Sequence, residues 1–210
     1  MLTQVTPRTL VNNVAVAVLF GVVVPWVKGI EYLDLFLLLP YALLSLFFVM
    51  PLVVNAVFAR GGTGVPLRAF FRAMLTGWFT GTCVLWMGIA TVSFRVGRFV
   101  APPIAVGLAL AVLSLFACLL AGALAAWTAN RVDDEAAAKG RLRIGLLLLL
   151  AAFFAVPRVL HEDTVVWLLD FLTPEGLVRA TIAFVPVAAL ASVLLLTRVS
   201  RTSSRAPFHR

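Results

Sequence analysis

The sequence is poor in charged residues, and this excludes an ordinary soluble globular protein. Only 12% of its 210 residues are charged, about half of the roughly 25% found in soluble domains. In contrast, 62% are hydrophobic, and the mean hydropathy is +1.07. A water-soluble fold of this length cannot bury so much apolar surface, so lipid must solvate a large part of it.

Histidine and cysteine are scarce, which leaves few ligands for a metal or cofactor. The chain has two of each. Cys83 and Cys118 both fall inside long apolar blocks, where a free thiol acts as a small packing group. A zinc site takes several His, Cys or carboxylate ligands at set spacings, and no such spacing occurs. We therefore predict no metal and no cofactor.

Known catalytic and nucleotide-binding motifs are also missing. The chain contains no G-x-x-x-x-G-K-[ST], G-x-S-x-G or H-E-x-x-H pattern. No acid, base and metal groups gather within reach of a membrane surface, so we predict that the chain is not an enzyme. The net charge of +8 does not indicate nucleic acid, because the basic residues flank apolar blocks, where they orient helices and attract lipid headgroups.

Long apolar blocks dominate what is present. They lack the period-two alternation of barrel strands, so they predict helices, which satisfy their own backbone hydrogen bonds in hydrocarbon. The expected fold is an all-α, polytopic transmembrane bundle of about six spans in one domain, 1–199, followed by a disordered cytoplasmic tail, 200–210. The expected spans are residues 10–27, 33–59, 73–94, 99–129, 142–160 and 177–197.

The basic residues predict that both termini are cytoplasmic. With the N-terminus inside, twelve Lys and Arg residues fall on inner segments and five on outer segments, a clear positive-inside bias. The twelve inner residues are Arg8, Arg60, Arg68, Arg72, Arg131, Lys139, Arg141, Arg143, Arg198, Arg201, Arg205 and Arg210. The preference for Arg over Lys indicates a GC-rich bacterial genome, so we predict a multi-pass protein of the bacterial inner membrane.

The inner segment between the second and third spans is a candidate docking site for a partner. It reads RGGTGVPLRAFFR, a glycine-rich turn followed by a short helix that starts at Pro66. Apolar side chains on this helix would face lipid or protein, and Arg68 and Arg72, four residues apart, would face water or phosphate. The candidate docking residues are Pro66, Leu67, Arg68, Phe70, Phe71 and Arg72.

The outer side holds the chain's one cluster of His with carboxylates, His161, Glu162 and Asp163. It either binds a cation or is simply a solvated loop. Arg95 and Arg98, in a tight outer turn, are candidates to pair with Glu31, Asp34, Glu162 or Asp163, or to attract an anion. The apolar segment 161–176 is expected to be a short interfacial or re-entrant helix. Thr173-Pro174-Glu175 then predicts a helix start, with Thr173 as N-cap.

Two patterns predict contacts between helices. Asn12, Asn13 and Asn55 lie at similar depth in the first and second spans, as interhelical hydrogen-bond partners or as substrate contacts. Small residues at intervals of four on the third and fourth spans predict close helix packing, within the bundle or with a partner subunit. They include Ala73, Gly77 and Gly81 on the third span, and Ser114, Cys118, Gly122 and Ala126 on the fourth.

This order of parts resembles the six-helix permease of ATP-binding-cassette exporters. The resemblance covers most of the chain and is one of topology: six spans, an inner amphipathic segment after the second, and a partly inserted outer segment before the sixth. It implies that 66–74 docks on a separate ATPase and that 164–172 is re-entrant. The chain departs from the family in its short stretch before the first span and in its inner loop without acidic residues.

Three functions therefore stay open. The resemblance implies a transporter permease, whose partners would be the lipid bilayer and an ATPase subunit. Short loops and the absence of a soluble domain also suit a non-catalytic structural subunit of a larger membrane complex. A membrane-embedded enzyme that modifies lipids is the third alternative, and it lacks a matching set of catalytic groups.

Overall fold

The computed structural model describes residues 7–30, 43–59, 66–132, 134–159 and 173–203, and this part of the chain is helical with no strand. Its elements are α1 (Pro7–Val18), the π-helical segment η1 (Leu19–Val23), α2 (Val24–Lys28), α4 (Ser45–Phe58), α5 (Leu67–Val96), α6 (Ile104–Ala129), α7 (Glu135–Val159) and α9 (Pro174–Ser203).

Three of the described helices are long and apolar enough to cross a membrane. They span Leu67–Val96, Ile104–Ala129 and Pro174–Val199, with 30, 26 and 26 residues. At 1.5 Å of rise per residue, each exceeds the roughly 30 Å of hydrocarbon in a bilayer. The predicted all-helical membrane protein is confirmed at this level.

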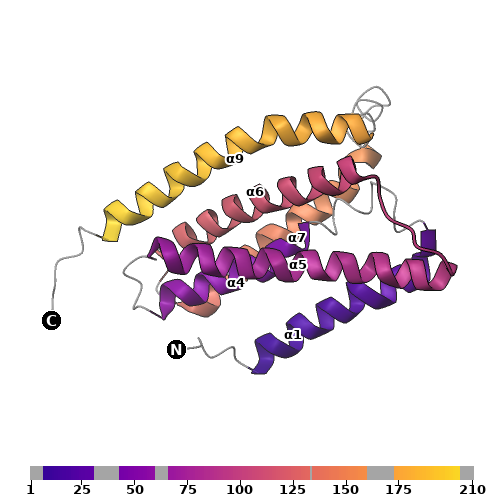
Figure 1. The fold of residues 1–210 in the computed structure, drawn as a ribbon. Helices are drawn as coiled ribbons and strands as arrows, with labels where there is room; N and C mark the ends of the chain where they lie inside the picture. The colour runs from indigo at the N-terminus through magenta and orange to yellow at the C-terminus, as the bar shows by residue number, and fades with distance from the viewer. Residues whose placement is uncertain (1–6, 31–42, 60–65, 133, 160–172, 204–210) are drawn as a thin grey trace.

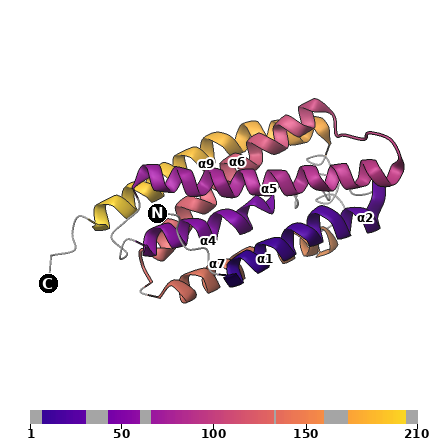
Figure 2. The same cartoon turned by 60° about the horizontal axis from the view of Figure 1, so that its bottom comes forward.

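The helices form an elongated bundle in which the continuous run of α1, η1 and α2 is followed by α4, α5, α6, α7 and α9 in alternating directions (Figures 1 and 2). α5 and α7 begin at the end of the bundle where α4, α6 and α9 finish, and α1 runs in the same direction as α5. α9 packs along α6, and α4 packs against both α5 and α6. Each of the six predicted spans overlaps a described helix.

The predicted fourth span began too early. We expected residues 99–129, but α6 begins at Ile104. Gly97 ends α5 in the left-handed conformation, with φ of 71°, which glycine adopts without strain. Pro102 and Pro103 follow, and a residue before proline is disfavoured in helix, so residues 97–103 form the connection and 99–103 are not part of the fourth helix.

The predicted fifth span began too late. We expected this span to begin at Leu142, with an inner loop before it, but α7 already starts at Glu135. Asp134 accepts hydrogen bonds from the backbone N–H groups of Ala136 and Ala137, each 3.1 Å long, and so caps the helix. Glu135 then pairs with Lys139 one turn later. The alanine-rich composition, read as a loop, is that of a strong helix former.

The start of the last helix is confirmed. α9 begins at Pro174, and the hydroxyl of Thr173 accepts the backbone N–H of Gly176 at 3.0 Å. Thr173 is therefore the N-cap, and Pro174 holds the first position, where its missing N–H costs nothing. α9 continues to Ser203, so residues 200–203 of the expected disordered tail are helical.

The π-helical segment η1 was not predicted. Pro25 has no N–H, so the carbonyl of Gly21 lacks its α-helical donor. The hydroxyl of Thr91, on α5, donates to that carbonyl at 3.0 Å. A neighbouring helix thus replaces the hydrogen bond that proline removes, as polar side chains commonly do inside membrane helices.

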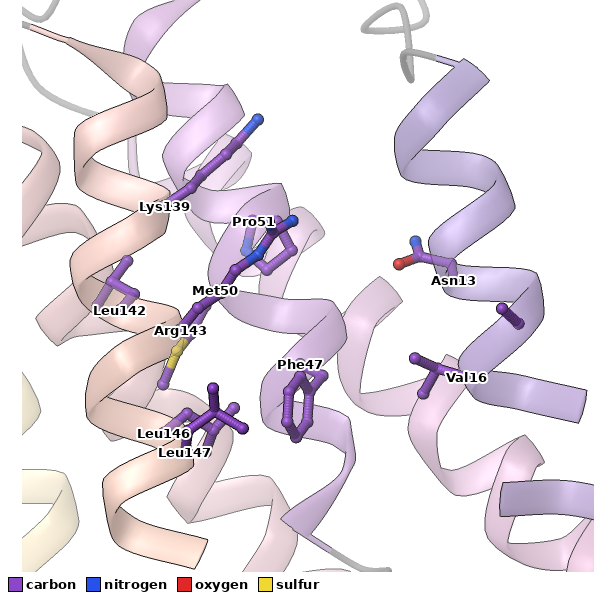
Figure 3. A pocket seen from close by; sticks show the side chains of 11 residues that line it. Asn13, Val16, Phe47, Met50, Pro51, Lys139, Leu142, Arg143, Leu146 and Leu147 are labelled. Atoms are coloured by element: carbon purple, nitrogen blue, oxygen red, sulfur yellow. The ribbon is translucent and has the colours of Figure 1, made fainter. Parts of the chain in front are cut away.

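We call α1, η1 and α2 together the first helix. Among the described elements, it packs on the bundle mainly through its second half. η1 and α2 lie against α5, whereas α1 has no extensive contact with α4 or α7. A cavity remains between these three helices, which Figure 3 shows from close by.

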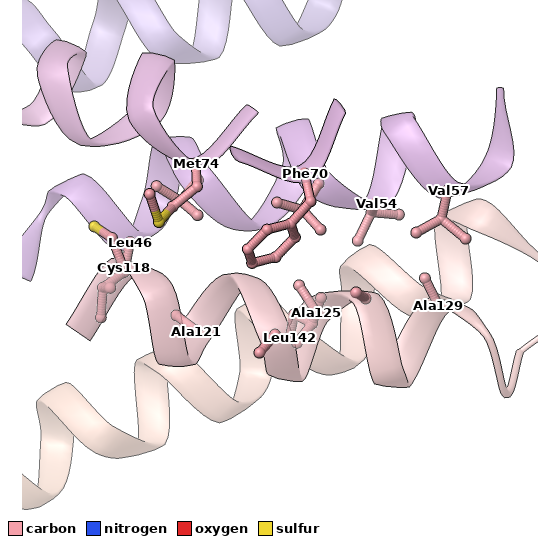
Figure 4. Close-up of a cluster of buried hydrophobic side chains, with 14 of the residues drawn as sticks. Leu46, Val54, Val57, Phe70, Met74, Cys118, Ala121, Ala125, Ala129 and Leu142 are labelled. Atoms are coloured by element: carbon pink, nitrogen blue, oxygen red, sulfur yellow. The ribbon is translucent and has the colours of Figure 1, made fainter. Parts of the chain in front are cut away.

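The core lies where α4, α5 and α6 meet (Figure 4). Phe70 and Met74 of α5 reach toward Cys118, Ala121 and Ala125 of α6, where the side chains are small enough to admit them. Gly77 and Gly81 bring α5 close to α4. A Cβ atom at Gly81 would lie 2.4 Å from Cα of Ser45, and one at Gly77 would lie 2.7 Å from Cα of Val49. The predicted small-residue packing on the third and fourth spans is confirmed within the bundle.

Candidate functional site

The cavity between α1, α4 and α7 is the candidate functional site, and we call it the α1–α4–α7 cavity. Its volume is about 330 Å³, which lies within the roughly 300–1,000 Å³ range of ligand pockets. It is lined by Asn13, Ala15 and Val16 of α1, by Phe47, Met50 and Pro51 of α4, and by Lys139, Leu142, Arg143, Leu146 and Leu147 of α7.

Two cations and one amide are the polar side chains of this lining. Lys139 and Arg143 are four residues apart on α7, so they lie on one face of that helix. Asn13 projects from α1 on the opposite wall (Figure 3). No carboxylate of the described residues lines the cavity, so the ionisable side chains of this described lining are both cations.

Lys139 and Arg143 differ in whether a neighbouring carboxylate neutralises their charge. Lys139 pairs with Glu135, and its side chain is 18% exposed. The Arg143 side chain forms no ion pair with any residue that the structure describes. A guanidinium offers five donors in a planar fork that matches carboxylate or phosphate. Among the described residues, Arg143 is thus the cation of the cavity that no carboxylate neutralises, and it is the candidate group to bind an anion.

The predicted docking residues lie at the start of α5. Pro66 is the N-cap, and Leu67–Val96 is one unbroken helix, so the docking segment and the third span are continuous. Leu67, Arg68, Phe71 and Arg72 are exposed, with Leu67 at 61% and Phe71 at 39%. Phe70 is only 1% exposed and packs in the core, so it is not part of this surface.

The predicted outer cluster is described only at its two arginines. Arg95 donates to the carbonyl oxygens of Trp26 and of Val27, the latter at 3.0 Å. These carbonyls belong to the last turn of α2, where intrahelical donors run out, so Arg95 caps the first helix. Arg98 is exposed in the following turn. His161, Glu162, Asp163, Glu31 and Asp34 lie outside the described residues.

The predicted asparagine set is divided. Asn13 lines the α1–α4–α7 cavity, and the side chain of Asn12 lies outside what the structure describes. The Oδ1 atom of Asn55 is buried and accepts no hydrogen bond within the described residues. Asn55 therefore carries an unsatisfied acceptor on α4, one turn beyond Pro51.

Sequence reasoning missed the cavity because no single segment forms it. Lys139 and Arg143 were named only among the inner basic residues, and Phe47 and Met50 fell inside the second expected span. One sequence signal could have indicated the site. Lys139 and Arg143 stand four residues apart at the start of an apolar run, so they share one helix face once 135–159 is recognised as helix. Within the described residues, no group of His, Cys, Asp and Glu side chains is arranged to hold a metal ion.

Comparison of the whole chain with protein-family models, with curated proteins and with solved structures finds no match.

Proposed function

We propose that the chain is the membrane-embedded permease subunit of a transporter, energised by a separate ATPase chain. In this proposal it crosses the bacterial inner membrane six times, with both termini in the cytoplasm. Three membrane-length helices, the alternation of helix directions and the positive-inside bias support the topology. No sequence or structural relative bears on it.

The start of α5 is the observation that carries the proposal of a partner. Thirty residues give α5 a length of about 45 Å, against about 30 Å of hydrocarbon, so its ends extend beyond the membrane core. Leu67 and Phe71 form one exposed stripe on its first turns, and Arg68 and Arg72 form another. An apolar stripe beside two cations suits a partner that presents an apolar groove with acidic residues at its rim.

Copurification tests this proposal. The tagged chain is purified in mild detergent from its native membranes, and the retained proteins are identified and assayed for ATP hydrolysis. We expect an ATPase in the wild-type sample. The double variant Arg68→Glu, Arg72→Glu should retain at least about tenfold less ATPase than wild type, since reversing two interfacial charges costs several kcal/mol.

The matched control is Arg141→Glu, an exposed arginine near the start of α7 that belongs to neither stripe. It should retain the ATPase fully. Recovery of membrane subunits without any ATPase would contradict the permease and favour a structural role in a larger complex. Recovery of a lone chain with lipid-modifying activity would contradict both.

A further inference from the structure

We propose that the α1–α4–α7 cavity binds an anionic phospholipid of the surrounding bilayer, with its phosphate at Arg143 and an acyl chain between α1, α4 and α7. This inference concerns the isolated chain and does not depend on an ATPase partner.

The distribution of side chains in the cavity matches an amphiphile. Figure 3 shows Lys139, Arg143 and Asn13 toward one end, and Phe47, Leu146 and Leu147 toward the other. A small soluble anion would use only the polar end. A neutral hydrocarbon would use only the apolar end. A molecule with an anionic head and an apolar tail uses both.

The charge of the cavity selects an anionic head. Lys139 forms an ion pair with Glu135, whereas Arg143 has no carboxylate partner among the described residues, and no carboxylate among those residues lines the cavity. Phosphate accepts two parallel hydrogen bonds from a guanidinium, and this charge-assisted pairing is stronger than pairing between neutral groups. Basic pockets between membrane helices on the cytoplasmic side bind anionic headgroups for this reason.

The packing of α1 explains why lipid, rather than protein, fills the space. Because η1 and α2 hold the first helix against α5, its opposite half stands away from α4 and α7. Val16 and Leu147 face this space from opposite sides, and Leu147 is 58% exposed. An acyl chain supplies the dispersion contacts that a void would lose.

Lipid binding to the purified chain tests the inference. The detergent-solubilised protein is delipidated and titrated, by native mass spectrometry, with phosphatidylglycerol, with phosphatidylcholine of the same acyl chains, and with inorganic phosphate. We expect phosphatidylglycerol to bind at least about tenfold more tightly than phosphatidylcholine. Inorganic phosphate should not bind at the same concentrations.

Two variants in the cavity and one control outside it locate the site. Arg143→Gln should bring phosphatidylglycerol down to the affinity of phosphatidylcholine, while Arg141→Gln, two residues away and outside the cavity, should keep the preference. Leu147→Trp fills the apolar end from an exposed position and should weaken both lipids. Each variant is first checked for an unchanged thermal transition. Equal binding of the two lipids to wild type, or an unchanged preference in Arg143→Gln, would overturn the inference.

Discussion

Single polar residues in the bundle matter through the backbone groups that they satisfy. The single hydroxyl proton of Thr91 is shared between two acceptors, the carbonyl of Met87 on its own helix at 2.9 Å and the carbonyl of Gly21 on the first helix at 3.0 Å. The second bond serves an acceptor that Pro25 has left without its α-helical donor. Arg95 serves the carbonyls of Trp26 and Val27 a little further along. Two side chains of α5 thus hold the first helix in place.

Thr91→Val tests the first of these contacts. Valine keeps the shape of threonine but cannot donate, so the carbonyl of Gly21 loses its partner. We expect a loss of about 1 kcal/mol in the free energy of unfolding, the typical net contribution of one hydrogen bond. Tryptophan fluorescence during thermal unfolding in detergent measures it.

Thr80→Val is the matched control, because within the described residues the hydroxyl of Thr80 on the same helix donates only to the carbonyl of Thr76, one turn earlier. The free energy of unfolding of Thr80→Val should stay within about 0.5 kcal/mol of wild type. An equal loss in both variants would show that the Thr91–Gly21 bond contributes nothing of its own.

At Asn55 we expect a substitution that does not lower the stability of the protein. Its Oδ1 atom is buried without a hydrogen-bond partner in the described residues. Replacing an unsatisfied polar group by an apolar one of similar size is neutral or stabilising. Asn55→Leu should therefore unfold at the same temperature as wild type or higher. A clear decrease would show that Asn55 has a partner outside the described residues.

At the scale of helices, glycine sets the distance between α4 and α5. Gly81→Ala places a Cβ 2.4 Å from Cα of Ser45, a backbone atom that cannot move alone. The helices must separate, and overpacking of this kind costs about 1–3 kcal/mol. We expect a lower thermal transition and a smaller monodisperse fraction in size-exclusion chromatography.

Gly107→Ala is the matched control on α6. A Cβ at Gly107 meets nothing within 4 Å, and alanine favours helix over glycine. It should be neutral or slightly stabilising. Should Gly81→Ala behave in the same way, the close approach of α4 and α5 would be wrong.

Sequence patterns predicted the helical elements best where the signal is local. Thr173-Pro174 marks the start of α9 because capping involves neighbouring residues only. The repeat of Gly77 and Gly81 indicated a close contact, because only small residues let helices approach so closely. The start of α7 was missed because low hydropathy was interpreted as loop, although alanine, glutamate and lysine favour helix.

Contacts between distant segments could not be predicted from the sequence. Phe70 was assigned to a surface segment, yet it lies in the core because α5 continues without a break from Leu67. Arg95 was expected near carboxylates, and its described partners are two carbonyls of the first helix. The α1–α4–α7 cavity depends on how three helices are arranged, and no pattern within one segment carries that information.

The whole molecule is a bundle whose apolar surface requires a bilayer. Large side chains such as Phe79, Ile182 and Leu190 are each more than 60% exposed. These side chains lie on helices of membrane length, so hydrocarbon is the solvent that makes their exposure favourable. We propose that the excess of Lys and Arg on the inner segments, counted from the sequence, orients the bundle in the membrane.

The topology can be measured directly in intact cells with a membrane-impermeant maleimide, which labels cysteines that water reaches from outside. The background variant carries Cys83→Ser and Cys118→Ala, so that it has no native cysteine. Arg98→Cys, between α5 and α6, should be labelled at once. Arg68→Cys, at the start of α5, should be labelled only after the membrane is permeabilised, and reporters fused to the two termini should both give a cytoplasmic signal. Labelling of both cysteines from the same side, or termini on opposite sides, would contradict the six-span bundle.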